Sequence, residues 1–141
     1  MNRLFRRSLP VLVAFAIPAF CLSDDLTNQQ LILCTSVSAM HCSEDGDCVV
    51  DMPWNLNIPQ FLQLNLKDKT MSTTKASGEN RATPIKTLTR EGGQIYLQGL
   101  EGGRAFSFVI NEESGLLSAG VATDGKVVSV FGACTPLAQA R

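Results

Sequence analysis

Apolar and polar residues alternate in short runs along the second half of this chain, from Pro84 to Cys134. The clearest run covers residues 104–110, where every second residue is large and apolar: Phe106, Phe108 and Ile110. Alternate residues of a strand point to the same face of a sheet. The pattern therefore predicts a strand that places these three side chains in a core.

Three further runs have strand character. In residues 94–100, Ile95 and Leu97 share a face with Gly99, and residues 116–123 are rich in small and apolar side chains. In residues 126–134, Val127 and Phe131 fall on one face and Val128 and Val130 on the other. Turn residues separate the runs, at Gly92-Gly93, Gly102-Gly103, Ser114-Gly115 and Asp124-Gly125. The run at 85–90 alternates imperfectly, since Ile85 and Leu88 fall on opposite faces of a regular strand.

The first half is less regular. Residues 31–37 and 48–52 predict two strands, the second ending at Pro53. Trp54 lies in phase with Leu56 and Ile58, which predicts a core or rim position for the tryptophan. The same phase continues through Leu62, Leu64 and Leu66. A turn at 67–69, a strand at 70–74 and a polar loop from Lys75 to Thr83 follow.

Turns at intervals of about 8 to 12 residues are typical of antiparallel all-β sandwiches and barrels. Helical periodicity is not sustained anywhere in the chain. Eight or nine short strands in sequential order would leave two exposed sheet edges unless the first and last strands pair. The predicted fold is therefore all-β: a small antiparallel up-and-down barrel, or a strongly curled meander, of about eight strands stapled by disulfides.

The N-terminal segment predicts export. Arg3, Arg6 and Arg7 precede an apolar stretch that is shorter than the ~20 residues needed to span a bilayer. We expect residues 1–23 to be a signal peptide, residues 24–141 to be a single β domain, and no stable membrane span to remain after cleavage. Removal of the three arginines changes the net charge from −1 to −4, without a basic cluster. Nucleic acid is therefore not an expected partner.

Cys34, Cys42, Cys48 and Cys134 remain after that cleavage, and disulfides are their expected use in an oxidising compartment. Four cysteines allow three connectivities. The turn-forming segment between Cys42 and Cys48 favours pairing of these two, which leaves Cys34 for Cys134. The second bridge would close a loop of about 100 residues, worth up to about 4 to 5 kcal/mol in the chain-entropy description.

A metal site is the alternative use of the first cluster. It would employ His41, Cys42 and Cys48, with the acidic residues 44–47 nearby. The sequence lacks the complete ligand spacing of a zinc site or of an EF-hand calcium loop. Neither a metal nor another cofactor is expected.

Candidate binding residues fall in the polar loop, at Ser77, Gly78, Glu79 and Arg81, because polar loops held by a rigid scaffold often carry function. The single histidine, His41, is expected to be exposed on a loop, and no nucleophile motif accompanies it. Arg90 and Arg104 lie at strand ends and are expected near a shared end of the sheet.

The stretch from Arg81 to Pro136, with its segments LQG, GRAFSFVI, ESG and FGACTP, resembles a family of small, uncharacterised secreted or periplasmic β-rich proteins of Gram-negative bacteria. This resemblance implies location and β character, with no activity attached. A weaker similarity is to the periplasmic C-type lysozyme inhibitors, small disulfide-bonded barrels with a Ser-Gly loop followed by an aromatic residue. Here Ser77-Gly78 is followed by Glu79, Asn80 and Arg81.

Two functional hypotheses follow. The first is a non-enzymatic binding or inhibitory module, secreted or periplasmic, whose partner is a protein or an envelope ligand. The second is a small carboxylate-dependent hydrolase acting on cell-envelope glycans, which would need two carboxylates facing one cleft. The candidates for that pair are Asp47, Asp51, Glu79, Glu91, Glu101, Glu112, Glu113 and Asp124.

Overall fold

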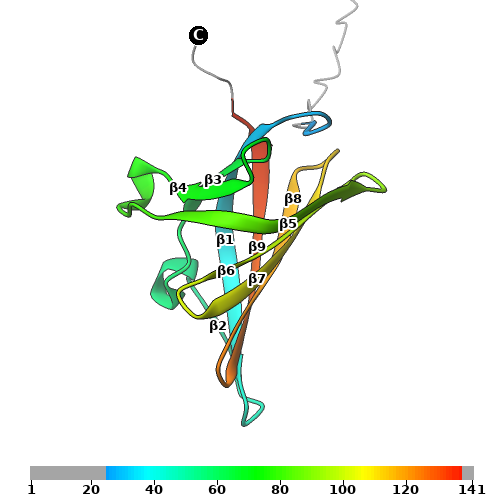
Figure 1. The fold of residues 1–141 in the computed structure, drawn as a ribbon. Coiled ribbons are helices and arrows are strands. Elements are labelled where there is room, and N and C mark those ends of the chain that lie inside the picture. The colour runs from blue at the N-terminus through cyan, green and yellow to red at the C-terminus, as the bar shows by residue number, and fades with distance from the viewer. Residues whose placement is uncertain (1–24, 138–141) are drawn as a thin grey trace, which may run out of the picture.

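The computed structural model describes residues 25–137, so the expected signal peptide at residues 1–23 lies outside the described residues. Nine strands and two short 3₁₀ helices make up this part of the chain (Figure 1). They are β1 (Leu31–Ser43), β2 (Cys48–Asp51), η1 (Pro53–Leu56), β3 (Phe61–Asn65), β4 (Thr70–Thr73), η2 (Lys75–Ser77), β5 (Ala82–Glu91), β6 (Gln94–Glu101), β7 (Arg104–Asn111), β8 (Leu116–Thr123) and β9 (Lys126–Pro136).

Eight of the strands form a closed antiparallel barrel. From β3 to β9 each strand pairs with the next, and β9 returns to pair with β1 along residues 32–43. The opposite edge of β1 is shared, because residues 31–35 pair with β3 and residues 39–42 pair with β2. The predicted barrel is confirmed, and β2 is an additional strand outside the ring.

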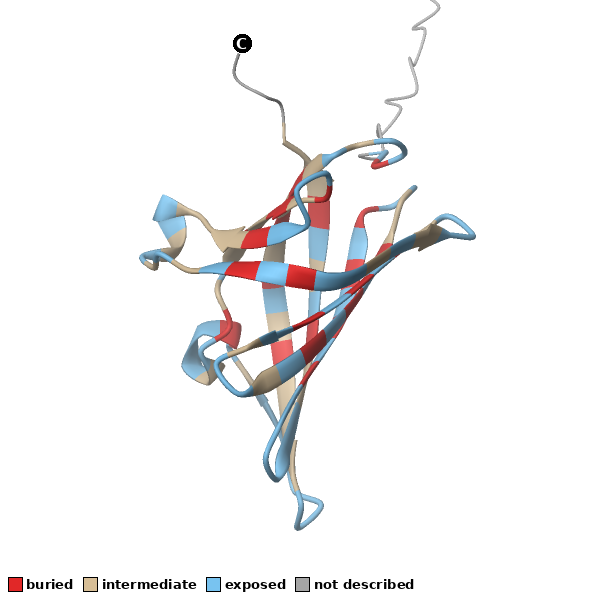
Figure 2. Ribbon diagram, viewed as in Figure 1, coloured by how far each residue is buried: buried red, intermediate tan, exposed pale blue. Residues whose placement is uncertain are grey.

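Buried and exposed residues alternate along the strands (Figure 2), and the buried ones belong to the predicted apolar faces. Phe106, Phe108 and Ile110 are buried, and the rings of the two phenylalanines lie 5.5 Å apart between centroids. The remaining core comes from every strand of the ring and from three residues outside it: Leu26, Ile58 and Leu66. Burial in this small barrel therefore follows the period of two seen in the sequence.

A β-bulge explains the imperfect pattern in β5. The pairing of β5 with β6 shifts between Ile85 and Thr87, so one extra residue occupies β5 there. Ile85 is buried, and Leu88 packs against the same core. The expectation that the two residues face opposite sides was wrong, because a bulge reverses the phase of the residues that follow it.

Both disulfides form as predicted, Cys34 with Cys134 and Cys42 with Cys48. Each joins residues that are direct partners across two antiparallel strands. The first bridge lies in the core and staples β1 to β9, where the barrel closes. The second staples β1 to β2 and removes the two thiolates that a metal site at His41 would need. Two disulfides are consistent with an oxidising compartment.

Two expectations for the first half were wrong. Trp54 is 53% exposed, since Pro53 starts the 3₁₀ helix η1 and the period of two of a strand does not apply there. His41 lies within β1, paired with Val49 and Val128, and is half-buried rather than exposed on a loop. Its Nδ1 is buried and has no hydrogen-bond partner among the described residues.

One end of the barrel is closed by the segment that precedes β1. Leu26 is fully buried, and its backbone N–H donates to the carbonyl of Glu112 at 2.7 Å. Arg90 holds this segment, because its guanidinium donates to the carbonyls of Leu26 and Gln29 and contacts Oε1 of Glu112 at 2.6 Å. We call this the plugged end. Within residues 25–137, no helix is long and apolar enough to cross a membrane.

Candidate functional site

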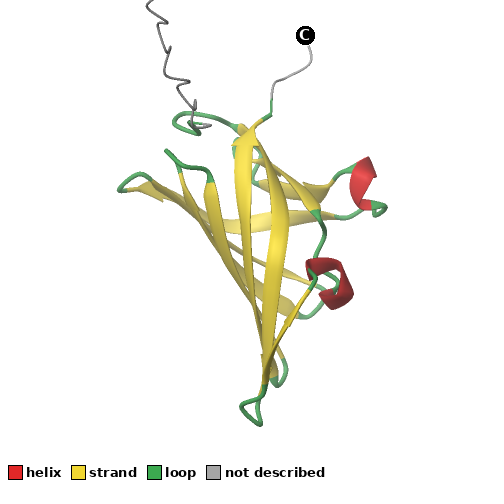
Figure 3. Ribbon diagram, turned by 180° about the vertical axis from the view of Figure 1, so that it is seen from behind, coloured by secondary structure: helices red, strands yellow, loops and turns green. Residues whose placement is uncertain are grey.

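The other end of the barrel carries four charged residues beside the two 3₁₀ helices, which lie on the same side of the barrel (Figure 3). Glu79 and Arg81 come from the turn before β5, Glu101 ends β6 and Arg104 begins β7. We call this group the arginine mouth. Its side chains are between 20% and 35% exposed, so solvent or a partner can reach them.

The tight turn between β6 and β7 brings Glu101 and Arg104 together. Gly102 and Gly103 have φ values of 54° and 79°, the left-handed conformation that a two-residue hairpin turn requires and that glycine adopts without strain. The flanking residues are therefore direct cross-strand partners. Nη2 of Arg104 lies 3.4 Å from Oε2 of Glu101.

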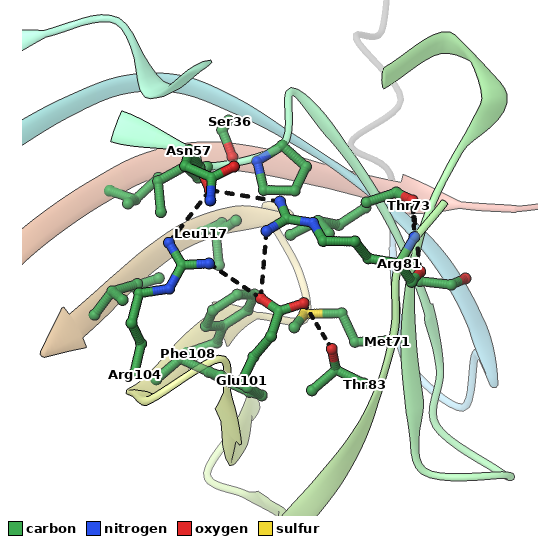
Figure 4. A pocket seen from close by; sticks show the side chains of 18 residues that line it. Ser36, Asn57, Met71, Thr73, Arg81, Thr83, Glu101, Arg104, Phe108 and Leu117 are labelled. Atoms are coloured by element: carbon green, nitrogen blue, oxygen red, sulfur yellow. Dashed lines mark hydrogen bonds and ion pairs between the residues drawn. The ribbon is translucent and has the colours of Figure 1, made fainter. Parts of the chain in front are cut away.

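Glu101 is the centre of the mouth (Figure 4). Its Oε1 accepts a hydrogen bond of 2.8 Å from the hydroxyl of Thr83, which is buried. Its Oε2 faces both arginines, at 3.4 Å from Arg104 and 3.6 Å from Nη1 of Arg81. One carboxylate therefore holds two guanidiniums side by side.

Asn57 completes the arrangement from the opposite side. It follows η1 in the left-handed conformation, with φ 56°, and its carbonyl accepts from Arg81 at 3.4 Å and from Arg104 at 3.3 Å (Figure 4). Asn tolerates this conformation better than most residues. The carbonyl and the Glu101 carboxylate thus position both arginines with contacts at the long end of the hydrogen-bond range.

Below the charged residues lies a small apolar cavity. It leaves about 40 Å³ for the centres of water molecules, and one water needs roughly 10 to 15 Å³ on this measure. Its walls are largely apolar side chains, among them Leu62, Met71, Phe106, Phe108, Leu117 and Val130. The interior is too small for a ligand of ordinary metabolite size, which places recognition at the rim.

The structure separates the predicted binding residues into two pairs. Glu79 and Arg81 belong to the mouth, and Nε of Arg81 lies 2.6 Å from Oε2 of Glu79. Ser77 serves the scaffold, because its hydroxyl donates to the carbonyl of Phe61 and accepts from the N–H of the same residue. Gly78 ends η2 with φ 69°. These two residues anchor the turn that carries the other pair.

The sequence did not indicate Thr83 or Asn57 as site residues, it indicated Glu101 only among the candidate carboxylates of a hydrolase, and it misplaced Arg104. Arg104 and Arg90 lie at opposite ends of the barrel, not near a shared end, because β6 runs the length of the barrel between them. The signal that could have found the mouth is Glu101-Gly102-Gly103-Arg104. A two-residue turn flanked by opposite charges predicts a cross-strand ion pair.

A second hollow, of about 550 Å³, lies on the outer surface over β5 to β9. Small residues such as Gly120 and Ala122 form its floor, and a side chain at Gly120 would meet open space. Lys86 is the only charged residue in its lining. The hollow lacks converging polar groups, so the arginine mouth is the better candidate site.

Metal chemistry has no support in the described part of the chain, where no three His, Cys, Asp or Glu side chains gather in a manner that could hold an ion. Comparison with protein-family models finds no match for this chain, and comparison with curated proteins finds none either.

Proposed function

We propose that the protein is a non-enzymatic binding module of the periplasm or cell exterior, and that it binds an acidic site of a partner protein through the arginine mouth. The observation that carries the proposal is the presentation of two partly exposed guanidiniums side by side at the rim of a rigid barrel. The expected signal peptide and the two disulfides support the location.

The geometry favours an anionic partner group. Arg81 and Arg104 contact Asn57 and Glu101 at 3.3 to 3.6 Å, longer than the ~2.7 to 2.9 Å of a strong charge-assisted hydrogen bond. Nε of Arg81 is held by Glu79 at 2.6 Å, which leaves the terminal nitrogens of both arginines as the groups with long contacts. A carboxylate of a partner could offer shorter, bidentate contacts to the planar guanidiniums. Arginine is also among the residues that contribute most to protein interfaces. The mouth is therefore built to gain energy when a carboxylate approaches.

The sharpest form of the proposal is inhibition of a glycan-cleaving enzyme. Such enzymes usually carry two carboxylates on either side of one cleft, and paired guanidiniums are complementary in charge to that arrangement. The similarity of the Ser77-Gly78 loop to that of lysozyme inhibitors supports this form. The turn that contains this loop also carries Glu79 and Arg81 into the mouth.

The hydrolase hypothesis is supported by one observation, the presence of Glu79 and Glu101 on either side of Arg81. Both carboxylates contact that guanidinium, and Glu101 also accepts from Thr83. Glu101 has both of its oxygens engaged and Glu79 has Oε2 paired with Arg81, so the two carboxylates are not arranged as a free acid and base facing one cleft. Binding is therefore the function that the geometry supports better.

A lysozyme inhibition assay tests the sharpest form. We expect the wild type to inhibit, and Arg81→Gln and Arg104→Gln each to raise the inhibition constant about tenfold, the loss of roughly 1.4 kcal/mol of contact energy. Lys86→Gln is the matched control, since it removes the same charge from an exposed outer position. Absence of inhibition by the wild type, or equal inhibition by all three variants, would eliminate the inhibitor form.

The broader proposal is tested by comparative capture from a periplasmic extract. Resin carrying the wild type should retain a partner that resin carrying the Arg81→Gln/Arg104→Gln double variant loses and that the Lys86→Gln resin keeps. An identical set of proteins on all three resins would refute binding through the mouth. Hydrolysis of peptidoglycan by the purified protein, abolished by Glu101→Gln, would instead establish the alternative.

A further inference from the structure

The strongest feature outside the mouth is the strand β2 and the residues around it. The hairpin of β1 and β2 extends beyond the ring of the barrel, with its tip at one end of the molecule (Figure 1). β2 stands at one end of the strand order, and β1 is its one partner among the strands of residues 25–137. We call residues 42–54 the β2 arm.

The exposed edge of β2 is apolar. Val49 and Val50 are 53% and 73% exposed, although adjacent strand residues point to opposite faces. Both faces of the strand are therefore open. Met52 and Trp54, each about half exposed, continue the apolar surface beyond the strand. A strand with a free edge displays backbone N–H and C=O groups that can pair with another strand, and exposed apolar side chains strengthen that tendency.

The arm is held in a fixed conformation. A two-stranded ribbon alone is only marginally stable in water. Here the disulfide between Cys42 and Cys48 joins the two strands, and the β1 strand of the arm also pairs with β9. The N–H of Glu44 donates to the carbonyl of Gly125, which fixes the hairpin against the β8–β9 turn. The edge is therefore pre-ordered for pairing.

The arm is strongly acidic. It contains Glu44, Asp45, Asp47 and Asp51, and the sequence has no Lys or Arg between Arg7 and Lys67. Lys126 pairs with Ser43 at the base of the arm, close in sequence to Asp124. Hydrogen bonds from the Asn55 side chain and the Met52 N–H hold the pKa of Asp51 below its ordinary value, so this carboxylate stays charged.

We infer that the β2 arm is a docking edge for an extended segment of another protein, one that carries basic residues interspersed with β-branched or aromatic residues. The segment adds a strand to the free edge of β2. Its apolar side chains cover Val49 and Val50, and its Lys or Arg side chains approach the acidic residues of the arm.

Charge disfavours a second copy as the occupant. Antiparallel pairing of two β2 strands would bring two acidic arms together, with four carboxylates from each chain and no arginine in either arm. Like charges brought together at an interface repel each other. A basic segment removes that repulsion, and the same acidic residues then attract the partner.

The inference does not depend on the proposed function of the arginine mouth. The two sites use different residues and prefer partner groups of opposite charge. Loss of mouth binding on Arg81→Gln therefore leaves the arm unaffected, and failure of the arm leaves the mouth unaffected.

The experiment uses a short synthetic peptide of alternating lysine and valine, titrated into the oxidised protein. Trp54 is the only tryptophan, so intrinsic fluorescence reports directly on the arm. We expect a saturable fluorescence change, together with slower hydrogen exchange of the backbone amides of Cys48–Asp51. The change should weaken as salt is added.

Two control peptides separate the contributions. Glutamate in place of lysine should weaken binding at least about tenfold, and methylation of the peptide backbone nitrogens, which keeps every side chain, should do the same because it removes the pairing donors. The Asp45→Asn/Asp47→Asn variant should also bind the lysine peptide more weakly, whereas Glu91→Gln, at the plugged end, should not. These positions are exposed, so folding is preserved.

Three results would overturn the inference. The first is no saturable binding of the lysine peptide. The second is equal affinity for the methylated peptide, which would show electrostatic attraction without strand pairing. The third is a concentration-dependent dimer that protects the amides of β2 without any peptide, which would identify a second copy as the occupant.

Discussion

Arginine and glutamate side chains are in contact at both ends of this barrel, but they have different roles there. At the plugged end, Arg90 contacts Glu112 at 2.6 Å and donates to carbonyls of the segment that contains Leu26. At the arginine mouth, Arg81 and Arg104 share Glu101 and the Asn57 carbonyl at 3.3 to 3.6 Å, while Nε of Arg81 lies 2.6 Å from Oε2 of Glu79. An arginine that donates to the backbone carbonyls of a terminal segment closes the barrel, whereas the longer contacts of the two mouth arginines, and of Arg104 above all, are ones that a partner can replace.

Truncation of Leu26, at the plugged end, should have the largest effect on stability. Leu26→Ala deletes a fully buried side chain from the end of the core, and we expect it to lower the free energy of unfolding by about 3 kcal/mol. Chemical denaturation measures the change. The exposed Leu100→Ala is the control and should cost well under 1 kcal/mol. Equal losses would show that the segment before β1 is not part of the folded core.

The two arginines offer the most direct contrast. Arg90→Gln leaves the carboxylate of Glu112 and two carbonyls without their donor, and should lower the free energy of unfolding by about 2 kcal/mol. Arg104→Gln breaks longer contacts, at 3.3 and 3.4 Å, and should cost at most about 1 kcal/mol. The same denaturation series compares them. If Arg104 proved the more destabilising of the two, the mouth would be a structural closure and not an open site.

Glu101→Gln changes the centre of the arginine mouth and should have a smaller effect on stability than Arg90→Gln. The neutral side chain can still accept from Thr83, but it no longer attracts two guanidiniums, so we expect a loss of about 1 kcal/mol in stability. NMR of the arginine side chains should show both guanidiniums becoming more mobile. Immobility of both in the variant would mean that the Asn57 carbonyl alone positions them.

The smallest effect on stability is expected from titration of Asp25, in the segment that precedes β1. Hydrogen bonds from the Thr27 side chain and backbone N–H hold the pKa of Asp25 below the ordinary aspartate value of 3.8. A carboxylate with a lowered pKa in the folded state stabilises the protein above the unfolded pKa, and this contribution is lost as the pH falls through the lowered value. The Thr27 amide resonance should therefore shift only below about pH 4. A midpoint above that value would contradict the hydrogen bonds.

The sequence predicts the strands better than the two ends of the barrel. The faces of β6, β7 and β9 follow directly from alternating residues, and cysteine spacing indicated both bridges. The plug was not foreseen, because Leu26 is a single apolar residue in a polar segment and has no periodic neighbours. The mouth was found only at Glu79 and Arg81. Asn57 and Glu101 lie far away in sequence and join them only when β6 and η1 take their places around the ring.

Local deviations account for the other differences. Ile85 and Leu88 are both large and apolar, and a regular strand would place one of them on the outer face. The break in alternation between them is therefore the sequence signal of the bulge. Trp54 follows Met52-Pro53, where proline begins a 3₁₀ helix as readily as it ends a strand. In both cases the apolar residues were identified correctly, but the backbone there is not a regular strand, so their predicted faces were wrong.

The pairing of β1 with β9 has a consequence for synthesis of the chain. β9 is made after every other strand, and its disulfide partner in β1 lies 100 residues earlier. A growing chain can therefore form its hairpins one by one, but it cannot close the ring until the last strand has been made. Until then both edges of the sheet are open, and oxidation of Cys34 and Cys134 then joins the first and last strands of the barrel covalently.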